Sequence, residues 1–200
     1  FNADFRRIEK AEKDRLLAKA GLNPNSAFLL HVGSDLPRKN RKLLIDMVAA
    51  LGERWDGKVC FAGEGLEKEL LDHANKIGVG ERVCSIVKPS HEILLALYNG
   101  CEAFVFPSFS EGFGWPVIEA QACGAPVIAS NLAPMPEVSG GAAMLADPYS
   151  PKDFAEAFLT LHRDISLKED LIKRGIKNIE RFHIDKMMRA YLELQGVKQD

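Results

Sequence analysis

The rest of the chain is organised around residues 106–120, which read Phe106-Pro107-Ser108-Phe109-Ser110-Glu111-Gly112-Phe113-Gly114-Trp115-Pro116-Val117-Ile118-Glu119-Ala120. The apolar run that enters it, residues 103–106, predicts a buried strand. Pro116 suits the first position of a helix, where its missing N–H has no intrahelical partner. A strand, a glycine-rich loop and a helix start therefore follow one another. This geometry directs unpaired N–H groups and a partial positive charge at whatever lies above the strand end.

Two carboxylates in this stretch, Glu111 and Glu119, are separated by seven residues. No Lys or Arg occurs between Cys101 and Ser150, so neither glutamate has a basic partner close by in the sequence. This isolation suits hydrogen bonding to neutral hydroxyls. Two ordinary acids beside a surface helix are the alternative interpretation. The intervening Gly-Phe-Gly-Trp-Pro favours a site, because glycines let a ligand approach the backbone closely.

The composition is that of a soluble globular protein. Two hundred residues suit one large domain or, as the alternative, two small ones, and 46% hydrophobic residues can form a substantial core. A net charge of −2 argues against a nucleic-acid binder that relies on bulk charge. No apolar run is long enough to span a bilayer. The four cysteines show no C-x-x-C spacing and are expected to be reduced core thiols of a cytosolic protein.

Apolar segments alternate with amphipathic ones along the whole chain. Strands that are apolar throughout and alternate with helices predict a parallel sheet covered on both faces. We therefore expect a single α/β domain, doubly wound around five to six strands, with extra helices within 151–200. The expected strands are 27–32, 58–62, 83–87, 103–106, 125–129 and an edge strand at 142–145; the expected helices are 8–20, 41–51, 66–77, 90–99, one from 116, a turn at 136–138, 151–163, 167–181 and 184–194.

Ligands of such sheets bind at the carboxyl ends of the strands, and the unusual residues of this chain fall in those loops. Arg38 and Lys39 lie where a strand turns into a helix, so they can form a phosphate cradle with backbone N–H groups. A solvated charge cluster is the alternative, but the helix dipole disfavours cations at that position. Gly63-Glu64-Gly65 is not the G-x-G-x-x-G fingerprint, so we predict no nicotinamide cofactor.

The histidines give weaker indications. His31 ends a core strand beside the predicted mouth, and we interpret it as a core histidine whose hydrogen bonds are satisfied. His73 and His162 lie on predicted helices among charged neighbours and are expected to be exposed.

Three motifs together resemble glycosyltransferase family 4. The resemblance implies two Rossmann-like domains facing a cleft, the GT-B architecture, of which this chain would be the C-terminal, nucleotide-sugar-binding half. Residues 1–7 would be the end of the interdomain linker, and the N-terminal acceptor domain would be absent from this chain. The motifs are Gly33-Ser34…Pro37-Arg38-Lys39-Asn40, then Phe106-Pro107-Ser108…Glu111-Gly112-Phe113-Gly114…Pro116…Glu119-Ala120…Gly124…Pro126-Val127-Ile128-Ala129-Ser130, then Pro136-Glu137-Val138.

The resemblance also implies roles for individual residues. Lys39 and Arg38 would hold the donor diphosphate, Glu111 would contact the donor-sugar hydroxyls, and these three form the implied catalytic set. Glu119 would bind the ribose. Many family members carry an arginine where this chain has Ser34, so Arg38 is expected to supply that charge. The implied donor-binding residues are Gly33, Ser34, Glu119, Gly112, Phe113, Gly114 and Trp115.

The implied activity is glycosyl transfer from a nucleotide-diphosphate sugar with retention of anomeric configuration. It would need no metal ion and no cofactor, and no nucleic acid is expected as a partner. With the missing N-terminal domain the acceptor would be a glycan or a lipid-linked saccharide, whereas the isolated domain is expected to be nearly inactive. The expected location is cytoplasmic, at the cytoplasmic face of the membrane, with peripheral association through the missing domain. The alternatives are a non-catalytic nucleotide-sugar sensor or scaffold, and an epimerase or phosphorylase of the same architecture.

Overall fold

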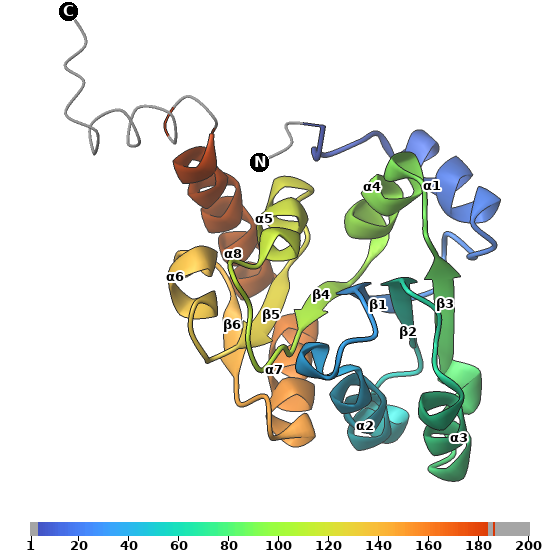
Figure 1. Ribbon diagram of the computed structural model, residues 1–200. Coiled ribbons are helices and arrows are strands. Elements are labelled where there is room, and N and C mark those ends of the chain that lie inside the picture. The colour runs from blue at the N-terminus through green and yellow to red at the C-terminus, as the bar shows by residue number, and fades with distance from the viewer. Residues whose placement is uncertain (1–3, 184–185, 187–200) are drawn as a thin grey trace, which may run out of the picture.

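The computed structural model describes residues 4–183 and 186. Six parallel strands form one sheet in the order β3-β2-β1-β4-β5-β6, which is the Rossmann strand order (Figure 1). The predicted doubly wound α/β fold is therefore confirmed, with six strands. The strands are β1 (Phe28–Gly33), β2 (Lys58–Gly63), β3 (Val83–Val87), β4 (Ala103–Phe106), β5 (Val127–Ser130) and β6 (Met144–Ala146).

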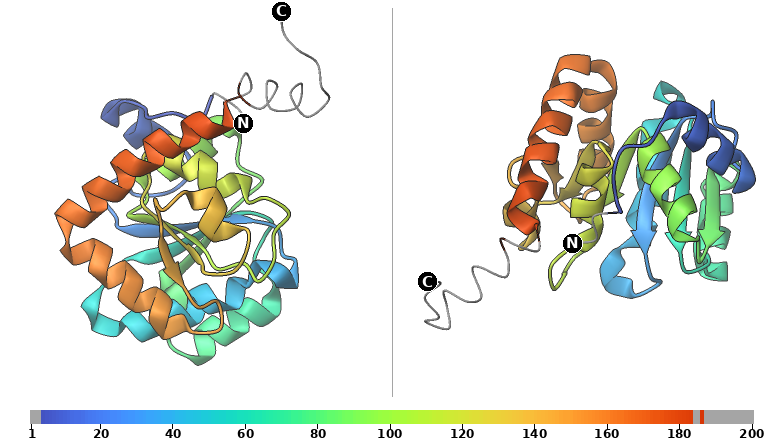
Figure 2. Two further views of the ribbon diagram at one scale, coloured as in Figure 1. Left: turned by 90° about the vertical axis from the view of Figure 1, so that its left-hand side faces the viewer. Right: turned by 90° about the horizontal axis from the view of Figure 1, so that it is seen from above.

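Helices connect the strands and cover both faces of the sheet. Helices α1, α4 and α5 lie above the sheet in Figure 1, whereas α2, α3 and α7 lie below it, and the views in Figure 2 show the same layers. The expected helix at 184–194 falls outside the described residues. The helices are α1 (Lys10–Lys19), α2 (Arg41–Leu51), α3 (Lys68–Lys76), α4 (His91–Gly100), α5 (Trp115–Ala122), α6 (Met135–Ser139), α7 (Pro151–Arg163) and α8 (Ile165–Asn178), with 3₁₀ turns at Pro37–Lys39, Gly52–Arg54, Gly80–Arg82 and Ile179–Phe182.

Several element boundaries differ from the prediction by one to three residues, among them the starts of α1, α3 and β6 and the end of α8. Two further differences have identifiable reasons. The strand expected from Ala125 begins at Val127, because Ala125 N–H donates to Ala120 O and closes the end of α5, with Gly124 left-handed at φ 73°. The helix expected from 167 begins at Ile165, because the Asp164 carboxylate accepts from Leu167 N–H and caps it.

The core has two layers because successive strand residues face opposite sides of the sheet. In β4, Phe104 and Phe106 pack with Tyr98 on the side of α4 and α5, while Ala103 and Val105 pack on the side of α2 and α7. All four β4 side chains are fully buried. Burial of every position explains why this strand is apolar throughout rather than alternating.

The cysteines carry no disulfide within the described residues. Cys60, Cys101 and Cys123 are buried and Cys84 is half-buried, and all four are free, as the sequence predicted. Among residues 4–183 and 186, no helix combines the length and the apolar character needed to cross a bilayer.

Candidate functional site

The centre of the site is a cluster of two cations and one carboxylate. The Arg38 Nη1 and Lys39 Nζ atoms lie 2.7 Å and 2.8 Å from the two oxygens of Glu111. The Lys39 and Glu111 side chains are only 9% and 7% exposed, whereas Arg38 is 42% exposed. The expectation that Glu111 stands apart from basic partners holds along the sequence but is wrong in space. Lys39 and Glu111 are 72 positions apart, and they meet because β1 and β4 are neighbours in the sheet.

The surroundings of Glu111 keep its carboxylate ionised at neutral pH. Burial acts to raise the pKa of Glu111, but the hydrogen bonds from Lys39 and Arg38 outweigh burial and hold that pKa below its usual value. The Lys39 ammonium also lies 4.8 Å from the centre of the Phe106 ring, a cation–π contact. One negative and two positive charges leave a net positive site at the carboxyl edge of the sheet, as an anionic ligand requires.

A set of hydrogen bonds joins the loop after β1 to the loop after β4. Phe109 N–H donates to Arg38 O at 2.8 Å, and the Arg38 guanidinium donates to Ser110 O at 3.1 Å. Asn40 is left-handed at φ 53°, and its side-chain amide donates to Pro107 O at 3.1 Å and to Pro148 O at 2.7 Å. Sequence reasoning did not foresee this structural role for Asn40, which fixes the turn that carries both cations.

Asn40→Ala is therefore expected to lower the free energy of unfolding by about 1–3 kcal/mol. Two carbonyls lose their donor, and alanine adopts the left-handed region less readily than asparagine does. Urea unfolding of both proteins measures this difference. Asn40→Gly is the matched control, because glycine tolerates the backbone but also lacks the amide. If alanine costs less than about 0.5 kcal/mol, the two hydrogen bonds do not hold the turn.

Glu119 lies apart from this cluster. Its Oε2 accepts a hydrogen bond of 2.9 Å from the hydroxyl of Tyr98, which is fully buried in α4. Burial raises the pKa of Glu119, and the bond from Tyr98 acts in the opposite direction. The two glutamates of the motif thus have different surroundings, since one is paired with cations and the other with a neutral hydroxyl.

The glycine loop before α5 combines an open backbone with a packed one. A Cβ at Gly112 would meet nothing within 4 Å, whereas Gly114, at φ 99°, is pressed against the Met135 side chain. No side chain caps the N-terminus of α5. The Phe113 and Trp115 rings lie 4.4 Å apart, and Trp115 is 38% exposed. The N–H groups at this end of α5 can therefore serve an anionic or hydroxyl-rich ligand.

Gly33 lies beside the side chains of both His31 and Lys39. A Cβ at Gly33 would stand 3.2 Å from His31 Nε2 and 3.4 Å from the Lys39 Cδ atom, so glycine gives Lys39 its room. His31 Nδ1 lies 3.1 Å from Val105 O and must donate to it, because a carbonyl only accepts. Its Nε2 has no hydrogen-bond partner within the described part of the chain. The prediction of a satisfied core histidine is therefore right for one nitrogen only.

His31 should make folding sensitive to mild acid. Burial, and then the charges of Arg41 and Lys39, lower its pKa to about 4 from 6.5, although Val105 and Glu111 act in the opposite direction. The unfolded chain therefore binds a proton between pH 6.5 and 4 that the folded chain does not, so stability is lost as the pH falls through that window.

Chemical denaturation at pH 7 and at pH 5 tests this linkage. His31 should account for about 2 kcal/mol of the stability lost between these pH values. His31→Gln retains a donor for Val105 O but does not titrate, so it should lose about that much less stability on acidification. An unchanged difference between the two pH values would show that His31 is not the titrating group.

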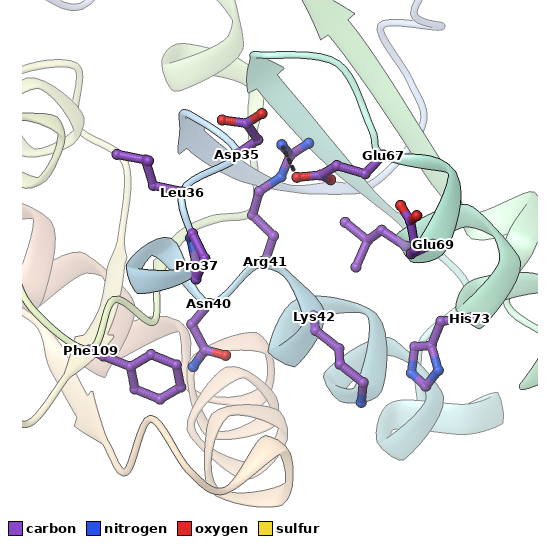
Figure 3. A pocket seen from close by; sticks show the side chains of 11 residues that line it. Asp35, Leu36, Pro37, Asn40, Arg41, Lys42, Glu67, Glu69, His73 and Phe109 are labelled. Atoms are coloured by element: carbon purple, nitrogen blue, oxygen red, sulfur yellow. Dashed lines mark hydrogen bonds and ion pairs between the residues drawn. The ribbon is translucent and has the colours of Figure 1, made fainter.

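The remaining cations of the basic run, and His73, have partners outside the cluster, and Figure 3 shows their side chains. Arg41 donates to Gly65 O at 3.0 Å and faces Glu67, and Lys42 pairs with Asp46 at 2.6 Å. His73 is hydrogen-bonded to Asp46 and half-buried, so the expectation that it is exposed is wrong; His162 is exposed as expected.

Two cations and a carboxylate lie at the carboxyl ends of β1 and β4, where the strand order reverses. This is the place at which sheets of the Rossmann type bind phosphorylated ligands. Residues 12–178 match the family described as glycosyl transferases group 1. The chain belongs to this family.

The chain is similar to O-antigen chain mannosyltransferase B of Escherichia coli, with 33% identity over 161 residues that cover 78% of this chain and 42% of the relative. It is also 28% identical to D-inositol 3-phosphate glycosyltransferase of Rhodococcus opacus over 202 residues, which cover 96% of this chain and 45% of that protein. The chain thus spans less than half the length of the curated relatives it matches.

Solved structures share the fold. Alr3699/HepE of Anabaena in complex with UDP superposes with a TM-score of 0.87 at 20% identity, covering 99% of this chain and 56% of the other. The C-terminal domain of LpcC from Francisella tularensis, a glycosyl transferase group 1 protein, superposes with a TM-score of 0.74 at 19% identity and covers 90% of this chain and 96% of the other. At such identities the likeness establishes the Rossmann-like fold shared with GT-B glycosyltransferases and not the ligand.

Proposed function

We propose that this chain is the donor-binding domain of a retaining glycosyltransferase that takes its sugar from a nucleotide diphosphate. A single observation carries the proposal: Glu111, from the loop after β4, is paired with Arg38 and Lys39, from the loop after β1, in one cluster at the carboxyl edge of the sheet. Membership of the glycosyl transferase family and the UDP bound to the HepE structure support it.

Each group of the site has a part in binding the donor. Arg38 and Lys39 neutralise the diphosphate, and the backbone N–H groups of residues 112–115 receive sugar and phosphate oxygens. Glu111 accepts hydrogen bonds from sugar hydroxyls, and Glu119, oriented by Tyr98, accepts those of the ribose. Gly33 and Ser34 form the floor beside the phosphates.

The same groups supply the chemistry proposed for sugar transfer. Cations and amides that are held in place before the reaction stabilise the charge that develops on the leaving diphosphate, so the proposal includes no metal ion and no cofactor. The two glutamates are assigned to binding rather than to the acid and nucleophile roles of a retaining hydrolase. Their partners support this, because Glu111 is held by cations and Glu119 by Tyr98.

A thermal-shift screen of the chain against UDP, GDP, ADP and their sugars tests this function. At a concentration of about 100 Kd the bound ligand adds about 2.7 kcal/mol, which corresponds to roughly 5–10 °C in Tm for a domain of this size. At least one nucleoside diphosphate and its sugar should give such a shift. If no member of the panel raises Tm, the chain is not a donor-binding domain.

The acceptor side belongs to the same proposal. An N-terminal domain on the full protein would position a saccharide or lipid-linked acceptor, and cytoplasmic location with peripheral membrane association through that domain is proposed with it. Since the acceptor cannot otherwise be oriented or water excluded, the 200-residue chain alone should transfer no sugar at a useful rate. Robust transfer by the purified chain in a radiolabelled-sugar assay would contradict this division of labour.

A further inference from the structure

A cavity lies beside the cluster of Arg38, Lys39 and Glu111, which is the proposed donor site. A groove of about 670 Å³ runs between the N-terminal ends of α2 and α3, in the size range of small-ligand sites. We name it the α2–α3 groove, and Figure 3 shows its side chains, which come from the loops after β1, β2 and β4 and from α2 and α3. The residues that line it include Leu36, Pro37, Arg41, Glu67, Leu70 and Phe109.

The groove and the proposed donor site are formed by the same two loops, those after β1 and β4. Pro37 lines the groove, while the next two residues of the same 3₁₀ turn, Arg38 and Lys39, face Glu111. Phe109 likewise lines the groove two positions before Glu111, and its N–H is bound to Arg38 O. A ligand lying in the groove would therefore be separated from the diphosphate cations by one turn of chain.

One part of the groove is apolar and held in place. Leu36 is 48% exposed, and Pro37 and Leu70 continue this surface. The Phe109 ring stacks on Tyr149 with centroids 5.0 Å apart and an interplanar angle of 27°. Tyr149 therefore supports one face of the Phe109 ring. Apolar and aromatic surfaces of this kind pack against the C–H faces of ring-shaped ligands.

The opposite part carries a buried arginine and a partly exposed glutamate, each with one atom that has no hydrogen-bond partner among the described residues. Arg41 is only 5% exposed, and it donates to Glu64 O and Gly65 O. Glu67 closes over it with a long contact of 3.5 Å, and the two side chains point toward one another in Figure 3. Arg41 Nε and Glu67 Oε2 have no hydrogen-bond partner within the described residues. A buried donor and a buried acceptor without partners are costly, so a ligand hydroxyl that entered the long contact between Arg41 and Glu67 would give both atoms a partner.

The charges around the groove select the class of that ligand. An anion would face the carboxylates of Asp35, Glu67 and Glu69, and a cation would face Arg41 and Lys42. A neutral ligand with several hydroxyls, each both donor and acceptor, and with an apolar ring face meets neither repulsion. We propose that the α2–α3 groove binds a neutral saccharide and serves as an acceptor subsite beside the proposed donor site. The acceptor part of this inference rests on the proposed function.

Two NMR measurements on one ¹⁵N-labelled sample test the inference. The probes are α-mannobiose, maltose and chitobiose, up to about 20 mM, where a complex of millimolar Kd is saturated. UDP or GDP, whichever stabilises the chain, is titrated separately. At least one disaccharide should shift the amides around Leu36, Glu67 and Phe109, and inorganic phosphate should not.

Three variants make the assignment specific. Phe109→Ala removes the ring and Glu67→Gln removes the charged acceptor, and each should weaken disaccharide binding about 3- to 10-fold. Both should leave the affinity for the nucleoside diphosphate unchanged within about twofold, because neither residue contacts the donor in the proposed complex. Glu169→Gln, an exposed change on α8, should alter neither affinity.

The outcomes separate the two proposals. Nucleotide binding without any disaccharide binding overturns the saccharide subsite and leaves the donor function standing. Disaccharide binding without nucleotide binding supports the groove as a saccharide site but overturns its acceptor role together with the donor function. Phosphate binding in the groove in place of the disaccharides, or equal disaccharide affinity in all three variants and the wild type, overturns the assignment of a neutral saccharide to this groove.

Discussion

Lys39→Ala is expected to weaken nucleoside diphosphate binding by about 1.5–3 kcal/mol, roughly 10- to 150-fold, because a charged hydrogen bond to the diphosphate is lost. No other side chain of the site can replace the charge of Lys39. No cation occurs between Cys101 and Ser150, and Arg38, which is 42% exposed, is the other positive group of the cluster. A nucleoside without phosphates should bind Lys39→Ala and wild type equally well.

Calorimetric titration with a nucleoside diphosphate and with the matching nucleoside measures both effects. Lys39→Met is a useful second variant, because it retains a stem over Phe106 while removing the charge. Lys42→Ala is the matched control: Lys42 is three positions along the chain, its partner is Asp46, and its loss should not change diphosphate affinity. Equal losses for the nucleoside and the diphosphate would mean that Lys39 acts through folding rather than through the phosphates.

Glu111→Ala and Glu119→Ala should differ in which ligand they affect and not only in severity. Glu119 is assigned to the ribose, which every nucleotide carries, so its loss should weaken the nucleoside diphosphate and the nucleotide sugar by a similar amount. Glu111 is assigned to the sugar, so its loss should remove much of the extra affinity that the sugar contributes. Glutamine at 111 keeps the volume but loses the charged acceptor, so it should be intermediate.

The ion pairs sharpen the expectation for Glu111. In the free chain its carboxylate neutralises part of the charge of Arg38 and Lys39, both within 2.8 Å. Removing it leaves both cations to the diphosphate, so the bare diphosphate should bind Glu111→Ala at least as tightly as it binds wild type. Calorimetry with both ligands on all three variants decides this. If Glu111→Ala harms diphosphate binding as much as Glu119→Ala does, the two roles are assigned wrongly.

Most of the fold could be predicted from local sequence patterns. Strands such as Phe104-Val105-Phe106 are buried on both faces, and this burial leaves a continuous apolar run that sequence periodicity detects. The boundaries that were wrong depend on a few hydrogen bonds. Ala125 closes α5 instead of starting β5, and Asp164 caps α8 two positions earlier than expected. Such capping competes with strand and helix propensities that differ by little.

The contacts of the site could be predicted only in part. The motif residues Arg38, Lys39 and Glu111 were expected at the mouth, and the structure brings them together. Their direct pairing depends on β4 lying beside β1, and local sequence carries no sign of which strands become neighbours. Tyr98, the partner of Glu119, was missed for the same reason, because 21 positions and a strand separate them. The retaining mechanism and the individual donor roles stay predictions.

One measurement tests the donor site most directly: a ¹H–¹⁵N spectrum of the labelled chain titrated with the nucleoside diphosphate that gives the largest thermal shift. The largest changes should fall on the backbone amides of residues 33–40 and 112–115, saturate at one ligand per chain, and weaken strongly in Lys39→Met. Saturable changes centred anywhere else, or changes that Lys39→Met leaves intact, would contradict the placement of the diphosphate between Arg38, Lys39 and the N-terminus of α5.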